Sequence, residues 1–274
     1  MFIKFYGTRG SIPVCEKGFQ EFGGNTTCVG LFGEDHEDIV IFDAGTGIRN
    51  LGKELMKKQF LPNQRIIIGF SHFHWDHIQG FPFFAPAYDP SKNIELVAYG
   101  KDLTIPNLKD VFLKQMESTF FPISLDDMGA KFSFELRKIN EQINDKGKLY
   151  VNAHSHPGGA HGYRLEINGK IIVFCTDVEH VDGIDPNVVE LSRNANILIH
   201  EGQYTPEELP KYKGWGHSSW EQAIEVAELA NVKKLFITHH DPDHDDEFLQ
   251  KVELQCQKRF PNCYLAREGK EIHF

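Results

Sequence analysis

The heptapeptide SHFHWDH, residues 71–77, directly follows an apolar run and carries four potential metal ligands within six residues. His72 and His74 lie two residues apart, so in an extended chain both imidazoles point the same way and can reach one ion. Asp76 and His77 are adjacent and can face a second ion only if the chain turns there, which the GFPFF stretch beyond them permits. Buried without an ion, these groups would leave donors and acceptors unpaired. The heptapeptide therefore predicts a metal site at a strand end, rather than a solvated polar loop.

Histidine and aspartate residues, which can bind metal ions, also follow other apolar runs. The run KKLFI leads into THHD, residues 238–241, and the runs IVIF and IIVFC are followed by Asp43 and Asp177. In layered α/β proteins, ligands bind in the crevice beyond the carboxyl ends of the strands. These endings therefore predict two sheet halves that converge on one site.

The apolar patterns predict short strands and helices in a layered α/β order. The expected strands are 2–7, 26–32, 39–42, 65–70, 94–99, 162–167, 171–175, 197–200 and 234–238, and the expected helices are 47–58, 106–119, 219–229 and 245–259. Ser218 and Glu221 have the spacing of a capping box before the third helix. No linker divides the sequence, so residues 1–274 are expected to form a single domain.

The composition excludes a disordered or fibrous chain, because 41% of the 274 residues are hydrophobic and 25% are charged. The net charge is −10, and no dense run of Lys or Arg offsets it, which argues against broad electrostatic binding of nucleic acid or of an anionic membrane. The sequence has neither a signal-peptide pattern nor a long apolar window, so a cytoplasmic protein is expected. The five cysteines contain no C-x-x-C pair and are expected to be reduced thiols.

The HxHxDH pattern of the heptapeptide resembles the signature of the metallo-β-lactamase-fold superfamily of hydrolases. Further stretches resemble the later motifs of that family in their expected order: FDAGTG at 42–47, HPGGAHGYRLE at 156–166, CTDVEH at 175–180, GWGHSSWEQA at 214–223 and ITHHDPDHDD at 237–246. The resemblance implies a four-layer αββα sandwich with a two-metal site between its sheets.

The resemblance also implies a set of ligands for two divalent metal ions. Zinc is the first choice for a hydrolase, and iron or manganese is an alternative. One ion would be held by His72, His74 and His156, the other by Asp76, His77 and His239, and Asp177 would bridge both. Such a pair attracts an anion and lowers the pKa of a bridging water.

Two ligand positions have a close competitor. His154 competes with His156, which is favoured because the histidine of the family directly precedes Pro-Gly-Gly. His240 competes with His239 and is expected to support the ligands from behind. Asp43 is expected to accept an imidazole N–H from a ligand, although it could instead cap the helix that begins near residue 47.

Other motifs lead to weaker expectations. His217 resembles the proton donor or substrate-contacting histidine of the family, and a surface histidine at a helix start is the alternative. The resemblance breaks down at Glu201, for which no role is predicted. The loops GTRGS at 7–11 and GGNTT at 23–27 could present backbone N–H groups and Arg9 to a phosphate, but structural turns are favoured.

The first functional hypothesis is metal-dependent hydrolysis of a phosphodiester or another small anionic ester. A metal-bridging hydroxide would attack, Asp76 and His217 would be the catalytic residues, and His217 would protonate the leaving oxygen. Resemblance extends to the cyclic-phosphodiesterase and tRNA 3′-processing branches, but tRNA processing is disfavoured because segment 101–132 is roughly neutral rather than basic. The expected partner is a small anionic substrate or a diatomic ligand, with no extended nucleic-acid surface and no membrane. The oligomeric state is open, with a homodimer as one option.

The second hypothesis is a non-hydrolytic di-iron protein that binds or senses dioxygen or nitric oxide. An aromatic surround that includes Phe73, Trp75 and Phe81 would restrict access to the site, although ordinary core packing explains these residues equally well. Against this hypothesis, di-iron flavoproteins of the same fold carry Glu where this chain has His74, and no flavodoxin-like domain follows.

Overall fold

Two seven-stranded sheets face each other in the computed structural model, which describes residues 1–33, 38–60, 64–99, 107–137, 142–144 and 147–274. The first sheet has the order β14 (Glu271–His273), β1 (Phe2–Gly7), β2 (Cys28–Phe32), β3 (Ile39–Phe42), β4 (Arg65–Phe70), β5 (Asn93–Tyr99) and β6 (Lys131–Arg137). The second has the order β13 (Cys263–Leu265), β12 (Leu235–Thr238), β11 (Ile197–Glu201), β10 (Lys170–Cys175), β9 (Ala160–Ile167), β8 (Gly147–His154) and β7 (Gln142–Asn144).

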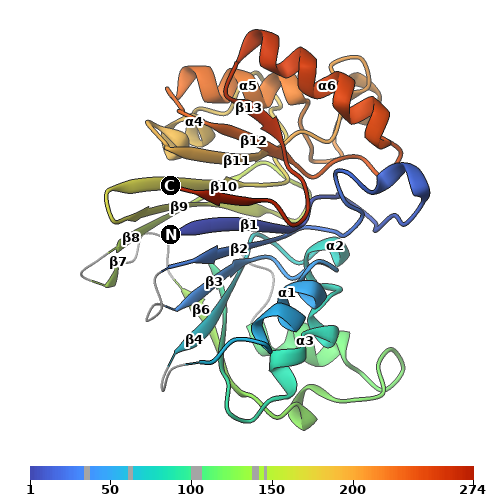
Figure 1. Ribbon diagram of the computed structural model, residues 1–274, viewed down its shortest axis with the longest axis vertical. Coiled ribbons are helices and arrows are strands. Elements are labelled where there is room, and N and C mark those ends of the chain that lie inside the picture. Colours follow the sequence, from blue (N-terminus) through green and yellow to red (C-terminus); the bar gives the residue numbers. More distant parts are fainter. Residues whose placement is uncertain (34–37, 61–63, 100–106, 138–141, 145–146) are drawn as a thin grey trace.

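Helices cover the outer face of each sheet (Figure 1). The first sheet is covered by α1 (Ile48–Leu55) and α3 (Leu108–Gln115), and the second by α4 (Pro186–Ser192), α5 (Trp220–Leu229) and α6 (Asp246–Arg259). A single turn, α2 (Trp75–Ile78), follows β4. This arrangement confirms the expected four-layer αββα sandwich. Among the described residues, no helix has the length and apolar character needed to cross a membrane.

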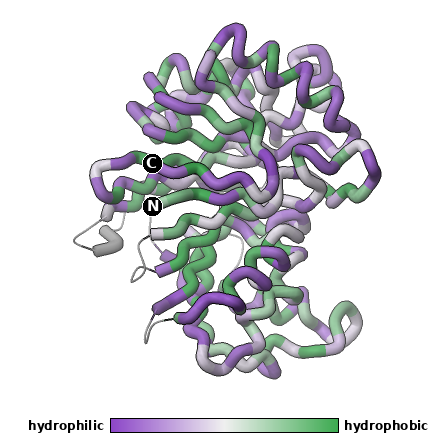
Figure 2. Tube along the Cα trace, viewed as in Figure 1, coloured by the Kyte–Doolittle hydropathy of each residue, from purple (hydrophilic) through white to green (hydrophobic). Residues whose placement is uncertain are grey.

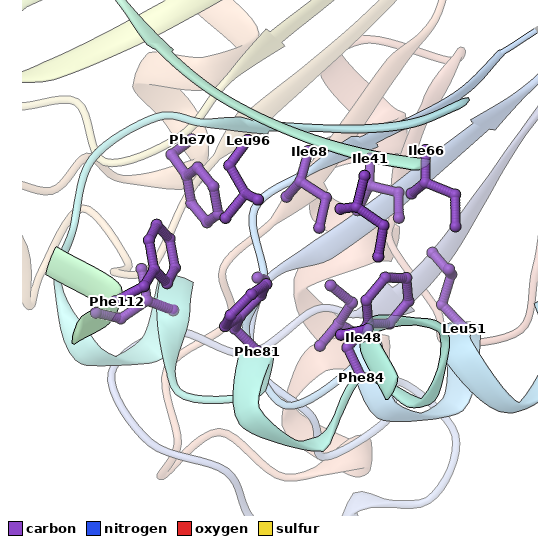
Figure 3. Packing of buried hydrophobic residues seen from close by; sticks show 14 of the residues in the cluster. Ile41, Ile48, Leu51, Ile66, Ile68, Phe70, Phe81, Phe84, Leu96 and Phe112 are labelled. Atoms are coloured by element: carbon purple, nitrogen blue, oxygen red, sulfur yellow. The ribbon is translucent and has the colours of Figure 1, made fainter. Parts of the chain in front are cut away.

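Three apolar layers hold the sandwich together. One lies between the sheets and includes Phe5, Phe174 and Phe236. Another lies between the first sheet and its helices, where side chains of the strands point toward those of α1 and α3 (Figure 3). The third lies under α4, α5 and α6. Figure 2 shows the matching pattern, with hydrophobic residues concentrated along the strands and hydrophilic residues along the outer turns. Burial of both faces of each sheet explains why most strands read as continuous apolar runs.

The strand directions determine where the site forms. Strands β3 to β6 run parallel to one another, and so do β10 to β13, so the carboxyl ends within each group lie at one edge of their sheet. The segments that leave β3, β4, β10, β11 and β12 therefore start from these edges, which meet in the crevice predicted from the strand endings.

Two local predictions need correction. The capping box of α5 consists of Ser219 and Gln222, not of Ser218 and Glu221. Ser218 is instead held outside the helix, because its hydroxyl donates to the carbonyl of Val178. The helix expected over 106–119 is α3, whose N-cap is Asn107, and Pro106 lies outside the described residues.

Candidate metal centre

Three candidate site residues share an uncommon backbone conformation. Asp43, Asp177 and His239 have φ values of 59°, 58° and 59°, and each lies just beyond the carboxyl end of a strand. Positive φ is uncommon outside glycine and clusters at functional sites, because the surrounding structure must compensate for the strain. Here the left-handed residue ends the strand and turns the chain out of the sheet. The conformation thus helps to bring side chains from both sheets into one crevice.

The first donor group consists of three histidines. The ring nitrogens of His72, His74 and His156 lie within 4.8 Å of one another. His156 Nε2 is 3.0 Å from His74 Nδ1, and the ring centroids of His72 and His74 are 4.5 Å apart. His72 and His156 are buried, whereas His74 is exposed. The group therefore opens to solvent on the side of His74.

The second donor group is wholly buried and combines Asp76, His77, Asp177 and His239. His239 Nε2 lies 3.1 Å from Asp76 Oδ2, and His77 Nε2 lies 3.2 Å from the same oxygen. The turn that Asp76 and His77 need in order to face a second ion is the short helix α2. It begins directly after His74, whose backbone is extended, and it contains both residues.

Asp177 lies between the two groups. Its Oδ2 is 3.2 Å from His77 Nε2, and its Oδ1 is 3.4 Å from His239 Nε2. The same Oδ1 is 3.8 Å from His72 Nε2 and 3.9 Å from His156 Nε2. One carboxylate thus faces histidines of both donor groups, which is the arrangement of a ligand shared by two ions.

The unpaired nitrogens of this cluster fit bound cations. His72 Nε2 and His77 Nε2 are buried and have no hydrogen-bond partner among the described residues. A buried unpaired nitrogen costs on the order of 1–3 kcal/mol unless something binds it. Two ligand atoms bound tetrahedrally to one ion at about 2.1 Å lie roughly 3.4 Å apart, which matches the spacing around Asp177. Imidazole and carboxylate are ligands that suit zinc, iron and manganese.

Groups behind the histidines orient them. Asp43 Oδ2 accepts from His77 Nδ1 at 2.9 Å, and its Oδ1 accepts from the Ser71 backbone N–H at 2.7 Å. The carbonyl of Gly216 accepts from His156 Nδ1 at 2.8 Å. Gly216 has a φ of 91°, and a Cβ there would lie 2.2 Å from His156 Nδ1, so only glycine fits this close approach. These bonds occupy Nδ1 and turn Nε2 of both histidines toward the other donor atoms, where an ion would bind. The N-cap of α1 is Gly47, not Asp43.

The competing histidines lie outside the donor groups. His154 Nε2 donates to the carbonyl of Thr176 at 2.9 Å, and its Nδ1 is 3.8 Å from Cys175 Sγ. Burial lowers the pKa of His154 to about 3, so the ring is neutral. His240 Nε2 donates to the carbonyl of Ala266 at 3.0 Å. That bond leads away from the cluster, so it does not orient a candidate ligand.

His217 and Glu201 form one wall of the centre. His217 Nδ1 lies 3.8 Å from both Asp177 Oδ1 and Glu201 Oε1. Burial lowers the pKa of His217 to about 3 against the opposing charge of Asp177, so the ring is neutral at physiological pH. Burial raises the pKa of Glu201 to about 8. Its carboxylate accepts backbone N–H groups of Val178, Gln203 and Ser218. The sequence predicted no role for Glu201, because the resemblance breaks down there, and its backbone partners come from segments that only the fold brings to it.

The N-terminal loop forms another wall. The Ser11 N–H donates to Asp76 Oδ2 at 2.8 Å, and a Cβ on Gly10 would lie 2.3 Å from the His239 ring. Arg9 is fully buried and donates to the carbonyls of Gly23, Asp241 and His244. Its guanidinium therefore ties the N-terminal loop to the loop that follows β12.

The chain is similar to known proteins in its family pattern, in its sequence and in its fold. A model described as the beta-lactamase superfamily domain matches residues 39–240. Ribonuclease Z of Prochlorococcus marinus (strain MIT 9515) is 27% identical over 326 residues, which cover 98% of each chain. Ribonuclease BN of Cronobacter sakazakii (strain ATCC BAA-894) is 24% identical over 318 residues and also covers 98% of each. The crystal structure of human tRNase Z, short form, superposes with a TM-score of 0.70 at 19% identity, covering 100% of this chain and 99% of that one.

These names contradict the expectation of a small anionic or diatomic ligand without a nucleic-acid surface, because ribonucleases act on RNA. That expectation rested on the net charge of −10 and on the neutral segment 101–132. A net charge sums over the whole surface, whereas metal ions supply positive charge locally, where a phosphodiester must bind. The neutral charge of segment 101–132 shows only that this segment is not a basic arm, and it does not exclude RNA as a substrate. Residues 101–106 lie outside the described residues.

Proposed function

The chain belongs to the beta-lactamase superfamily, and we propose that it is a metal-dependent hydrolase that cleaves phosphodiester bonds in RNA. The observation that carries the proposal is the position of Asp177, whose two oxygens face buried Nε2 atoms from both donor groups. The ribonuclease relatives, which are matched over nearly the whole of this chain, support the substrate class.

Two divalent ions, with zinc as the first choice, would occupy the centre. His72, His74 and His156 would hold one, Asp76, His77 and His239 would hold the other, and Asp177 would bind both. When bound, such a pair lowers the pKa of water and stabilises negative charge on a phosphoryl group. Residues 1–274 would act as one domain, because the donors come from both sheets.

The side chains of the protein would contribute orientation and proton transfer. Asp43 holds His77 in the tautomer that exposes Nε2, and the Gly216 carbonyl does the same for His156. His217 lies 3.8 Å from Asp177 Oδ1 and would donate a proton to the leaving oxygen. A neutral imidazole is too weak an acid to do so alone, so Nδ1 would take a proton from the carboxyl group of Glu201 as the ring releases its own.

The test is hydrolysis of bis(4-nitrophenyl) phosphate and of a short single-stranded RNA by protein loaded with zinc or manganese. Both substrates should be cleaved, and chelation followed by re-addition of metal should abolish and then restore the rate. Because the ions provide most of the stabilisation of developing charge, the rate without metal should approach background. The absence of cleavage with zinc, manganese and iron alike would overturn the proposal.

A further inference from the structure

Several large hydrophobic side chains are exposed at positions close in the chain to residues of the centre. Trp75 is 64% exposed and follows His74, the exposed member of the first donor group. Trp215 is 63% exposed and precedes Gly216. Ile12 and Val181 are also exposed. Ile12 directly follows Ser11 of the N-terminal loop, and Val181 lines a cavity together with His217. Single exposed apolar residues are ordinary, but a group around a candidate active site indicates a binding surface.

Trp75 and Trp215 lie on two segments that meet at His156. His156 Nε2 is 3.0 Å from His74 Nδ1, and His156 Nδ1 is 2.8 Å from the Gly216 carbonyl. Each tryptophan is one residue away from one of these contacts. The backbone at both tryptophans therefore lies next to the first donor group, and both side chains are exposed.

Trp215 is held in place by its surroundings. Its ring packs edge-on against Tyr212 at 5.3 Å, Tyr212 stacks on Tyr204 at 4.5 Å with an interplanar angle of 8°, and Tyr204 lies 6.0 Å from the His217 ring. The Glu179 carboxylate accepts the N–H groups of Gly214 and Gly216 on either side of the indole. A fixed aromatic surface loses little entropy when a ring stacks on it.

Lys213 is a cationic residue beside the centre, because it lines a cavity of about 190 Å³ together with His217 and Glu179. Phosphate contacts of such groups depend on salt and do not involve the bases. Aromatic stacking provides an alternative, because every base offers a π-face, and such stacking is worth roughly 1–3 kcal/mol per base.

We infer that Trp75 and Trp215 stack on the bases that flank the scissile phosphodiester of a single-stranded RNA segment. This inference rests on the proposed function and specifies how the substrate is held. The stacking contribution to binding is then largely independent of base sequence and of salt. A base-paired region cannot bind in the same way, because its bases are already stacked on one another.

The experiment measures fluorescence anisotropy of a labelled phosphorothioate oligoadenylate hexamer, which resists cleavage, with zinc-loaded protein. Trp75→Ala and Trp215→Ala should each raise Kd by about 5- to 100-fold, whereas the phenylalanine variants should retain most of the affinity. The ratio of the Kd of each alanine variant to that of the wild type should stay nearly the same at 50 and at 200 mM KCl, because stacking does not release counterions. A hexamer of the same backbone without bases should bind the wild type and the alanine variants equally weakly.

Leu254→Ala is the matched control, since Leu254 is 61% exposed on the outer helix α6. This variant should bind the hexamer like the wild type. Unchanged Kd values in both tryptophan variants would overturn the inference. A change in the sedimentation of these variants without a change in hexamer binding would also overturn it, because it would show that the tryptophans form an interface between copies of this chain. Metal-dependent cleavage of bis(4-nitrophenyl) phosphate separates the two proposals. Cleavage without tryptophan-dependent binding would contradict only the stacking inference. Tryptophan-dependent binding without any cleavage would contradict only the proposed hydrolase function.

Discussion

Asp43 and Asp177 occupy equivalent positions in the two sheets and share one backbone conformation. Asp43 follows β3 with a φ of 59°, and Asp177 lies two residues beyond β10 with a φ of 58°. Both carboxylates contact His77, the first at Nδ1 and the second at Nε2. Each sheet thus contributes one strained aspartate, and the pair holds a single imidazole from both sides. The two aspartates have different tasks, since only Asp177 faces the histidines of both donor groups.

Asp43→Asn should weaken metal binding and preserve the fold. Asparagine tolerates positive φ, so the backbone turn should survive, but the amide is a poorer acceptor for His77 Nδ1–H. Loss of such a supporting partner typically costs about 10- to 100-fold in metal affinity. Competition with a zinc chelator measures the change. Asp43→Ala should lose more, because alanine disfavours this φ, and equal affinity of Asp43→Asn and the wild type would show that the contact does not orient His77.

Asp177→Asn should reduce the bound metal from two equivalents to one or none. The substitution removes the charge that balances the two ions and leaves one oxygen for both donor groups. Metal per chain is measured by mass spectrometry after exhaustive dialysis. Asp126→Asn, at an exposed site on the first half of the chain, is the control and should retain all metal. Two equivalents retained by Asp177→Asn would show that the shared ligand has been assigned wrongly.

Local patterns predicted the elements that carry long apolar runs. The run at 65–70 is β4, the run at 39–42 is β3, and the helix expected at 245–259 begins one residue later as α6. The short strand β14 was not predicted, because its three residues pair with β1 from the opposite end of the chain. Nothing in a local window indicates such a partner.

The heptapeptide indicated a metal site because it concentrates rare residue types after a strand, and the resemblance to the metallo-β-lactamase-fold superfamily implied the remaining candidate ligands. Supporting groups were harder to predict, since main-chain atoms carry no residue signature. The Gly216 carbonyl, the Ser11 N–H and the backbone partners of Glu201 all act through the backbone. Net charge misled the choice of substrate, because it averages over surface that the substrate does not touch.

Glu179→Gln should loosen the loop that carries Trp215 and Gly216. The carboxylate accepts the N–H of Gly214 at 2.6 Å and that of Gly216 at 3.1 Å, whereas an amide has one oxygen for the two donors. Hydrogen bonds to a charged group contribute about 1.5–3 kcal/mol, so exchange of the Gly216 amide should accelerate roughly 10- to 100-fold. Hydrogen exchange followed by mass spectrometry detects this. Glu190→Gln, on the exposed face of α4, should leave exchange unchanged, and identical exchange in Glu179→Gln would remove the positioning role.

The contribution of Glu253 to stability should disappear at acidic pH. Burial alone raises the pKa of this carboxyl, but hydrogen bonds from Arg267 and the Leu265 N–H outweigh it and lower the pKa below its usual value. A group with a lowered pKa in the folded state stabilises the protein above its unfolded pKa of about 4.3 and loses that effect as pH falls through the folded value. Urea unfolding should therefore separate the wild type from Glu253→Gln clearly at pH 7 and much less at pH 3. A difference that grows on acidification would contradict the assignment.

His217→Ala should retain its metal and lose activity in a way that depends on the leaving group. His217 contacts the centre through Asp177 at 3.8 Å and lies outside the two donor groups proposed to hold the ions, so metal content should stay at the wild-type value. A proton donor matters most when the departing oxygen is basic, so the loss should reach about 100-fold or more for an alkyl ester and be small for a nitrophenyl ester. Rates are compared across a series of substituted phenyl diesters with the zinc-loaded enzyme. His273→Ala, at an exposed histidine of β14, should follow the wild type throughout. An equal loss along the whole series would leave His217 a binding residue and assign protonation of the leaving oxygen to solvent or to another group.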